Sequence, residues 1–90
     1  MHVDLGLFEE DDLLFQGKIT VTDSEYQEEN EIIKLKHQLI SDEAIIELRV
    51  FQDGEQVIKS TLSMPIHESE DWESIELSGY TLAFKCRLNA

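Results

Sequence analysis

The strongest constraint on the fold is an alternation of apolar residues with polar or small ones near the end of the chain. Tyr80, Leu82, Phe84, Cys86 and Leu88 occupy every second position. Successive side chains of a β-strand point to opposite faces of a sheet, so this run would give one unbroken apolar face. The alternation therefore predicts a strand over 80–88, with that face buried and the strand near the centre of its sheet.

The dipeptide Ser78-Gly79 joins this strand to a shorter apolar run over 73–77. Glycine tolerates the positive φ that tight hairpin turns require. A two-residue loop would place Leu77 opposite Tyr80 and keep the apolar residues of both strands on one face. The pattern therefore predicts a hairpin here.

A second hairpin is predicted at Asp53-Gly54, between a strand pattern that ends at Gln52 and one that begins at Val57. A two-residue loop would set Val50 opposite Val57 and bring apolar residues against polar ones further along. A loop one residue longer sets Val50 opposite Ile58 and keeps the apolar residues together. Because the buried face determines register, we predict the longer loop.

The N-terminal part of the chain predicts two more strands. Val3 to Phe8 alternates weakly, and Leu13 to Thr22 is rich in β-branched residues, which favour extended backbone. Gly17 interrupts the second run and is a candidate β-bulge.

The segment 24–40 fits two structures. As a helix, it would bury Ile32, Leu35 and Leu39 on one stripe behind a capping residue at its start. As a strand, it would also alternate, but His37 would then join the buried face. The sequence leaves both alternatives open.

These patterns predict a single domain spanning 1–90. Its fold class is mainly β, or α+β if 24–40 is helical: a small antiparallel meander or sandwich of five to seven strands, with at most one helix. A chain of 90 residues can bury one modest core.

Charge is the dominant compositional feature. Twenty Asp and Glu residues against seven Lys and Arg residues give a net charge of −13 at pH 7. A protein that binds DNA or RNA directly must neutralise phosphates with cations, so we expect no direct nucleic-acid binding. Anionic lipid would also repel such a surface, and we expect no membrane association. The expected partner is a basic protein.

Fourteen of the twenty carboxylates lie in three spans that contain no Lys or Arg. We call these the first (9–12), second (23–31) and third (68–76) acidic clusters. Five carboxylates on nine extended residues give about one charge per 6 Å, against one per ~1.7 Å of duplex DNA. One extended cluster is too dilute to imitate a duplex, so imitation requires that clusters converge or that the second be helical.

Two aromatic residues stand inside these clusters, Tyr26 in the second and Trp72 in the third. Aromatic side chains rimmed by solvated charge are typical anchors of protein interfaces. The predicted partner-binding residues are these two and the carboxylates around them: Glu25, Tyr26, Glu28, Glu29, Glu31, Glu68, Glu70, Asp71, Trp72 and Glu73. The alternative is that the clusters are acidic turns that serve solubility.

The sequence shows no pattern of a catalytic or metal site. It contains no phosphate-binding glycine loop and no GxSxG or HExxH motif. The three histidines are too far apart for a zinc site, and the acidic turns lack EF-hand spacing. No histidine is spaced to activate Cys86. We therefore expect no enzymatic activity, no cofactor and no metal.

The favoured hypothesis is a non-enzymatic acidic inhibitor or decoy. It would bind a basic, nucleic-acid-binding or nuclease-type protein and occlude its phosphate-binding surface, as immunity, anti-restriction and anti-defence proteins do. The alternative is a small structural, adaptor or chaperone-like subunit that forms a homo-oligomer. The stretch 1–12 lacks the features of a signal peptide and the lone cysteine fits a reducing compartment, so we expect a cytoplasmic location.

Overall fold

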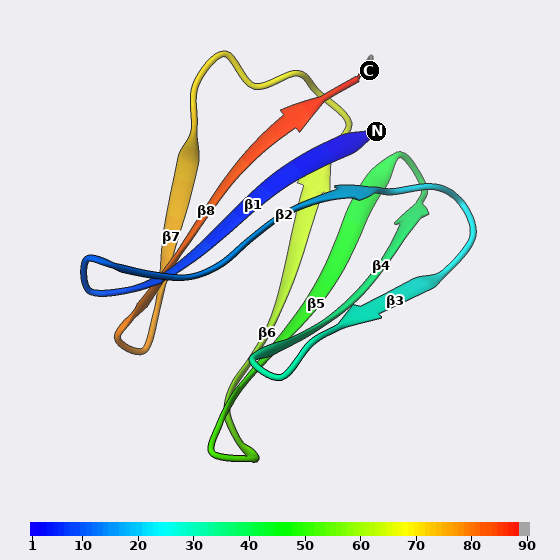
Figure 1. The fold of residues 1–90 in the computed structure, drawn as a ribbon. Coiled ribbons are helices and arrows are strands. Elements are labelled where there is room, and N and C mark those ends of the chain that lie inside the picture. The colour runs from blue at the N-terminus through cyan, green and yellow to red at the C-terminus, as the bar shows by residue number, and fades with distance from the viewer. Residues whose placement is uncertain (89–90) are drawn as a thin grey trace. The chain divides into compact units, whose positions relative to one another are not determined.

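The computed structural model describes residues 1–88, which contain eight strands and no helix (Figure 1). The strands are β1 (His2–Glu9), β2 (Asp12–Thr20), β3 (Tyr26–Glu29), β4 (Ile33–Ile40), β5 (Glu43–Gln52), β6 (Glu55–Pro65), β7 (Glu73–Leu77) and β8 (Tyr80–Arg87). The prediction of a mainly β, antiparallel fold is confirmed, with one strand more than the upper end of the predicted range. Within these residues no helix is long and apolar enough to cross a bilayer.

Close contacts divide the chain into two compact units, each built on one four-stranded sheet. The first unit comprises Met1–Thr20 and the chain from His67 onward, and the second is the continuous segment Val21–Ile66. That the whole of 1–90 is a single domain stays a prediction.

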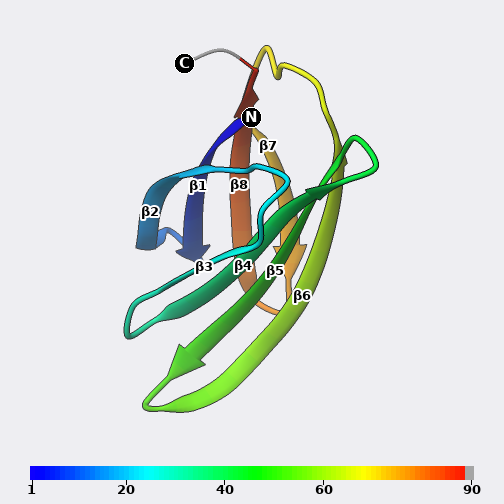
Figure 2. The same ribbon diagram turned by 90° about the vertical axis from the view of Figure 1, so that its right-hand side faces the viewer.

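The sheet of the first unit has the strand order β2-β1-β8-β7. Figure 2 shows β1 and β8 side by side, and their register places Leu5 opposite Phe84 and Leu7 opposite Leu82. These four side chains form the middle of the buried face. The strand predicted over 80–88 is therefore an inner strand, as expected, although it ends at Arg87 and Leu88 is exposed.

The predicted hairpin at Ser78-Gly79 is confirmed. Leu77 pairs with Tyr80, and both turn residues have positive φ values, 46° for Ser78 and 90° for Gly79. Two successive positive φ values match the twist of the flanking strands and close a tight hairpin.

The prediction of a bulge at Gly17 is wrong. Gly17 pairs regularly with Leu5, and the extra residue lies at Leu14, where the register between β1 and β2 shifts. A Cβ at position 17 would lie 2.7 Å from the ring of Phe15, so a larger residue there would require that ring to shift.

The second unit is a meander with the strand order β3-β4-β5-β6. Val50 pairs with Ile58, so the register predicted for this hairpin is confirmed. The longer loop is wrong: Gln52 pairs with Glu55 across a two-residue turn, and the extra residue is absorbed by a bulge at Val57. Burial of the apolar face determined the register, and the bulge at Val57 makes that register compatible with a two-residue turn.

The helical alternative for 24–40 is wrong, because this segment forms β3 and β4. The Asn30 side chain accepts hydrogen bonds from the backbone N–H groups of Ile32 (2.7 Å) and Ile33 (2.9 Å), which reverses the chain between the two strands. Such side-chain bonds compete with helical ones. His37 joins the buried face, as the strand alternative required, and it finds a partner in Glu28.

The turn between β1 and β2 provides a test of local strain. Glu10 has a φ of 54°, a region that costs most L-residues roughly 1–2 kcal/mol and is open to glycine. We expect Glu10→Gly to be more stable than Glu10→Gln by about 0.5–1 kcal/mol, although both remove the same charge. Urea denaturation of the two variants measures this difference, and equal midpoints with equal slopes would contradict it.

Candidate partner-binding surfaces

The first acidic cluster and the loop residues of the third cluster lie at opposite ends of the sheet of the first unit, whereas Glu76 of the third cluster lies on β7 near the end that carries the first cluster. The first cluster forms the β1–β2 turn, at the same end as the β7–β8 turn (Figure 1). The third cluster begins in the β6–β7 loop, where the backbone N–H of Ser69 donates to the carbonyl of Cys86. Cys86 lies six residues along β8 from Tyr80, which is about 20 Å at a rise of roughly 3.3 Å per residue. The two loops therefore do not form one continuous acidic patch.

The carboxylates of the second cluster form several contacts within their own unit. Three of its carboxylates contact basic side chains of β4: Glu25 with Lys36 (3.5 Å), Glu28 with His37 (2.9 Å) and Glu29 with Lys34 (3.7 Å). Its carboxylates also alternate between the two faces of β3, because Glu28 pairs with Leu35 and Glu29 with Lys34. The second cluster is extended rather than helical, so by itself it cannot imitate a duplex.

Tyr26 is exposed but engaged with a neighbour. Its ring centroid lies 6.2 Å from that of His37, and the two rings are tilted by 30°. Tyr26 therefore covers a buried histidine, which is a structural role whether or not it also contacts a partner.

The third cluster keeps more of its charge available. Glu73 accepts a hydrogen bond from the Ser69 hydroxyl (3.2 Å) and lies 3.6 Å from Nε2 of His67. Glu68, Glu70 and Asp71 are exposed, and within residues 1–88 none of them forms an ion pair. Trp72, which follows Asp71, has half of its surface exposed. The structure thus brings three unpaired carboxylates and an exposed indole together in one short loop.

The polar face of the second unit carries a feature that the sequence analysis missed. Four of the seven cations project from it: Lys34 and Lys36 from β4, Arg49 from β5 and Lys59 from β6. Lys34, Arg49 and Lys59 are directly opposite one another across three strands, an arrangement that like charges normally disfavour. The signal was available in the sequence, because in extended segments Lys34, Arg49 and Lys59 alternate with Leu35, Leu48 and Ile58 and therefore fall on the opposite face.

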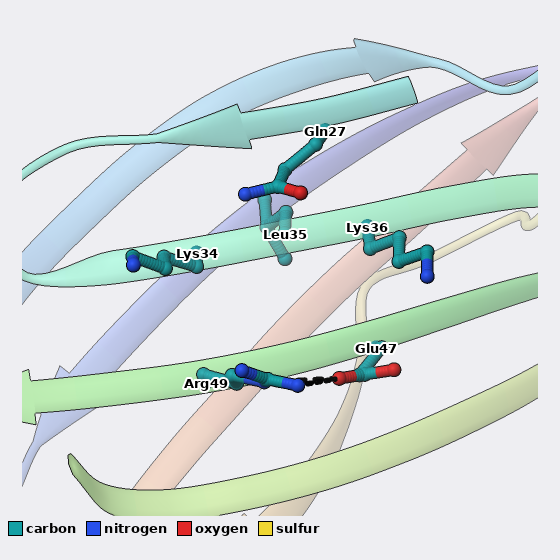
Figure 3. A pocket seen from close by; sticks show the side chains of 6 residues that line it. All are labelled: Gln27, Lys34, Leu35, Lys36, Glu47 and Arg49. Carbon is teal, nitrogen blue, oxygen red and sulfur yellow. Dashed lines mark hydrogen bonds and ion pairs between the residues drawn. The ribbon is translucent and has the colours of Figure 1, made fainter. Parts of the chain in front are cut away.

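Figure 3 shows Lys34, Lys36 and Arg49 around a shallow depression of about 110 Å³, which Glu47 also lines. Arg49 contacts the carboxylate of Glu47 at 2.9 Å. A hydrogen bond from Arg49, together with the nearby positive charges of Arg49, Lys59 and Lys36, holds the pKa of Glu47 below its usual range. Lys34 lies 5.2 Å from the centroid of the Phe51 ring. The cations are therefore compensated by local carboxylates and an aromatic face.

The residues that the structure describes form neither a group of metal ligands nor an activated thiol. Among residues 1–88 no three His, Cys, Asp or Glu side chains gather so that they could hold a metal ion. Cys86 is buried, and burial raises the pKa of its thiol, although a hydrogen bond with Ser69 acts in the opposite direction. A thiol in this environment is not activated as a nucleophile.

The pair Glu28–His37 yields a stability test. His37 is 2% exposed, and among the described residues its Nδ1 has no hydrogen-bond partner, so Glu28 is its polar contact through Nε2. We expect Glu28→Ala to lower the free energy of unfolding by about 1–3 kcal/mol, and Glu28→Gln, which keeps an acceptor, to lower it less.

Adding His37→Leu to Glu28→Ala should restore most of the loss, because it removes the ring nitrogens that would stay buried without partners. Urea denaturation of the three variants checks both expectations. A Glu28→Ala variant as stable as the original chain would show that this contact contributes nothing.

Comparison with known proteins adds no relative: no family model matches the chain, and neither a curated protein nor a solved structure is significantly similar to it. The argument about function therefore rests on the residues and geometry of this chain.

Proposed function

We propose that this protein is a non-enzymatic inhibitor that binds a basic, nucleic-acid-binding or nuclease-type protein and covers its phosphate-binding surface. The observation that carries the proposal is the β6–β7 loop, where Glu68, Glu70 and Asp71 form no ion pair within the described chain and directly precede the exposed Trp72. Carboxylates held in water without an internal partner are available to the cations of another protein.

The mechanism is occlusion by charge and by one aromatic contact. The net charge of −13 attracts a basic protein over a distance and speeds association. The loop carboxylates then take positions that phosphates would occupy. Trp72 adds a desolvated contact that slows dissociation, since buried tryptophans are among the strongest contributors to interfaces.

The separation of the first and third clusters favours a local contact over imitation of a whole duplex. The third cluster alone offers too few charges per unit length to replace a DNA helix. We therefore propose that the inhibitor binds one cationic patch or loop of its partner. The second cluster, in which Glu25 and Glu29 form ion pairs with lysines of β4, would contribute to long-range attraction only.

One observation favours the alternative of an assembly subunit. β6 is an eleven-residue strand at the edge of the second sheet, paired only with β5 in that sheet. A long edge strand can pair with a strand of another chain through its backbone. This alternative predicts a stable homo-oligomer that salt does not dissociate.

Two matched variants test the inhibitor proposal. Glu68→Lys/Glu70→Lys/Asp71→Lys reverses the charge of the β6–β7 loop, and Glu43→Lys/Asp53→Lys/Glu55→Lys reverses three exposed carboxylates at the turns of the second unit by the same amount. Each variant is coupled to a resin, exposed to cytosol of the source organism at low salt, and eluted with rising salt.

We expect a basic protein to be retained by the original chain and by the turn variant, and to be released from the loop variant at a much lower salt concentration. Free DNA should compete for the retained protein. Far-ultraviolet circular dichroism verifies that both variants are folded. Equal losses in both variants would mean that net charge alone acts, and unchanged retention in both would refute the proposal.

A further inference from the structure

An apolar pocket opens on the face of the first unit's sheet that carries Gly6, Phe8 and Ala83, opposite the face on which Leu7 and Leu82 are buried. It has a volume of about 260 Å³. Residues of three strands and of the β6–β7 loop line it: Leu5, Gly6, Phe8, Leu13, Gln16, Trp72 and Ala83. It is smaller than the roughly 300–1,000 Å³ pockets that hold small-molecule ligands. Its size therefore suits a single side chain better than a cofactor.

The pocket exists because small residues stand at its centre and large ones at its rim. Gly6 and Ala83 are directly paired in the sheet and leave the middle open. A Cβ on Gly6 would lie 3.2 Å from the ring of Phe8, so a larger residue would begin to close the space. Leu13 and Trp72 are 50% and 51% exposed although they flank an apolar surface. Large apolar side chains gathered on a solvated face mark an interaction site.

Carboxylates border the pocket on two sides. Phe8 and Leu13 directly flank the first acidic cluster in the sequence and form the end of the pocket next to that turn. Trp72 follows Asp71 and forms the opposite side. In the neighbouring row of the sheet, Asp4 contacts Lys18 (3.9 Å) and Arg87 (3.1 Å) and is paired with Lys85, so the carboxylates that border the pocket are those of the β1–β2 turn and of the loop before Trp72.

We infer that this pocket receives one large apolar side chain from a basic peptide segment of the partner, with Lys and Arg residues on both sides of it. The apolar residue would lie over Gly6 and Ala83 beneath Trp72. The flanking cations would lie against the first cluster and against Glu70 and Asp71. This inference rests on the proposed function and names the segment that the inhibitor recognises.

Trp72 makes the inference directly measurable, because it is the only tryptophan of the chain. The emission of an exposed indole shifts to shorter wavelength when the ring is buried. The intact protein is titrated with three nine-residue peptides without tryptophan. The first has Leu between four Lys or Arg residues on each side, the second has Ala in place of Leu, and the third has Leu between Asp and Glu residues.

We expect the first peptide to shift the emission and to bind at least about tenfold more tightly than the Ala peptide, from the burial of one leucine. The acidic peptide should not bind. Ala83→Leu, which fills the pocket but keeps Trp72, should abolish the emission shift and the advantage of Leu over Ala, while charge-driven binding of both basic peptides persists.

Several results would overturn the inference. If the Leu and Ala peptides bind equally without an emission shift, the pocket takes no side chain, whereas the proposed inhibitor function stands on its own capture experiment. If the acidic peptide binds as well as the basic one, the pocket is not selective for a basic segment. If no basic peptide binds while the third cluster still retains a basic protein from cytosol, recognition does not use this pocket.

Discussion

The first unit depends on the pairing of β1 with β8, because these are the two inner strands of its sheet. The buried pairs Val3–Cys86, Leu5–Phe84 and Leu7–Leu82 each join residues more than 70 positions apart. Closing so long a loop costs chain entropy, although the cost grows slowly with length. Full burial of each large apolar side chain offsets it by about 1.5–3 kcal/mol. The edge strands, and with them the loop that carries Trp72, are held in place by this inner pair.

Internal ion pairs, rather than the number of carboxylates, distinguish the acidic clusters from one another. The second cluster has the same number of carboxylates as the third but lies beside the cations of β4. Surface pairs of this kind contribute little to stability, yet they neutralise charge that would otherwise attract a partner. In a chain of net charge −13, the position of the cations therefore determines which acidic surface remains available.

Period-two alternation was sufficient to predict the strands over 43–52, 57–64, 73–77 and 80–88 and the registers Val50–Ile58 and Leu77–Tyr80. Alternation does not reveal which strand absorbs an extra residue, so the bulges at Leu14 and Val57 were missed. The helical alternative for 24–40 failed because a local turn at Asn30 and a partner for His37 on another strand decided the structure.

Of the predicted site residues, Glu68, Glu70, Asp71 and Trp72 lie in one loop, as their proximity in sequence implies. Proximity in sequence could not indicate that Glu25, Glu28 and Glu29 contact side chains of β4, because those contacts follow from pairing between strands. The apolar pocket was also outside its reach, since Phe8, Leu13, Ala83 and Trp72 come from three strands and a loop.

The second unit lies in sequence between the two segments that form the first unit, and this order has a consequence while the chain is being synthesised. The second unit is continuous in sequence, and all of its strands have been synthesised once residue 66 has been added. β1 and β2 must wait for β8, with Val3, Leu5 and Leu7 without their partner strand during that time. The four carboxylates of the β1–β2 turn lie beside these residues and oppose aggregation by mutual repulsion, as charged residues flanking apolar strands do in many proteins. The first acidic cluster thus places like charges beside an apolar strand during the interval in which that strand lacks its inner partner.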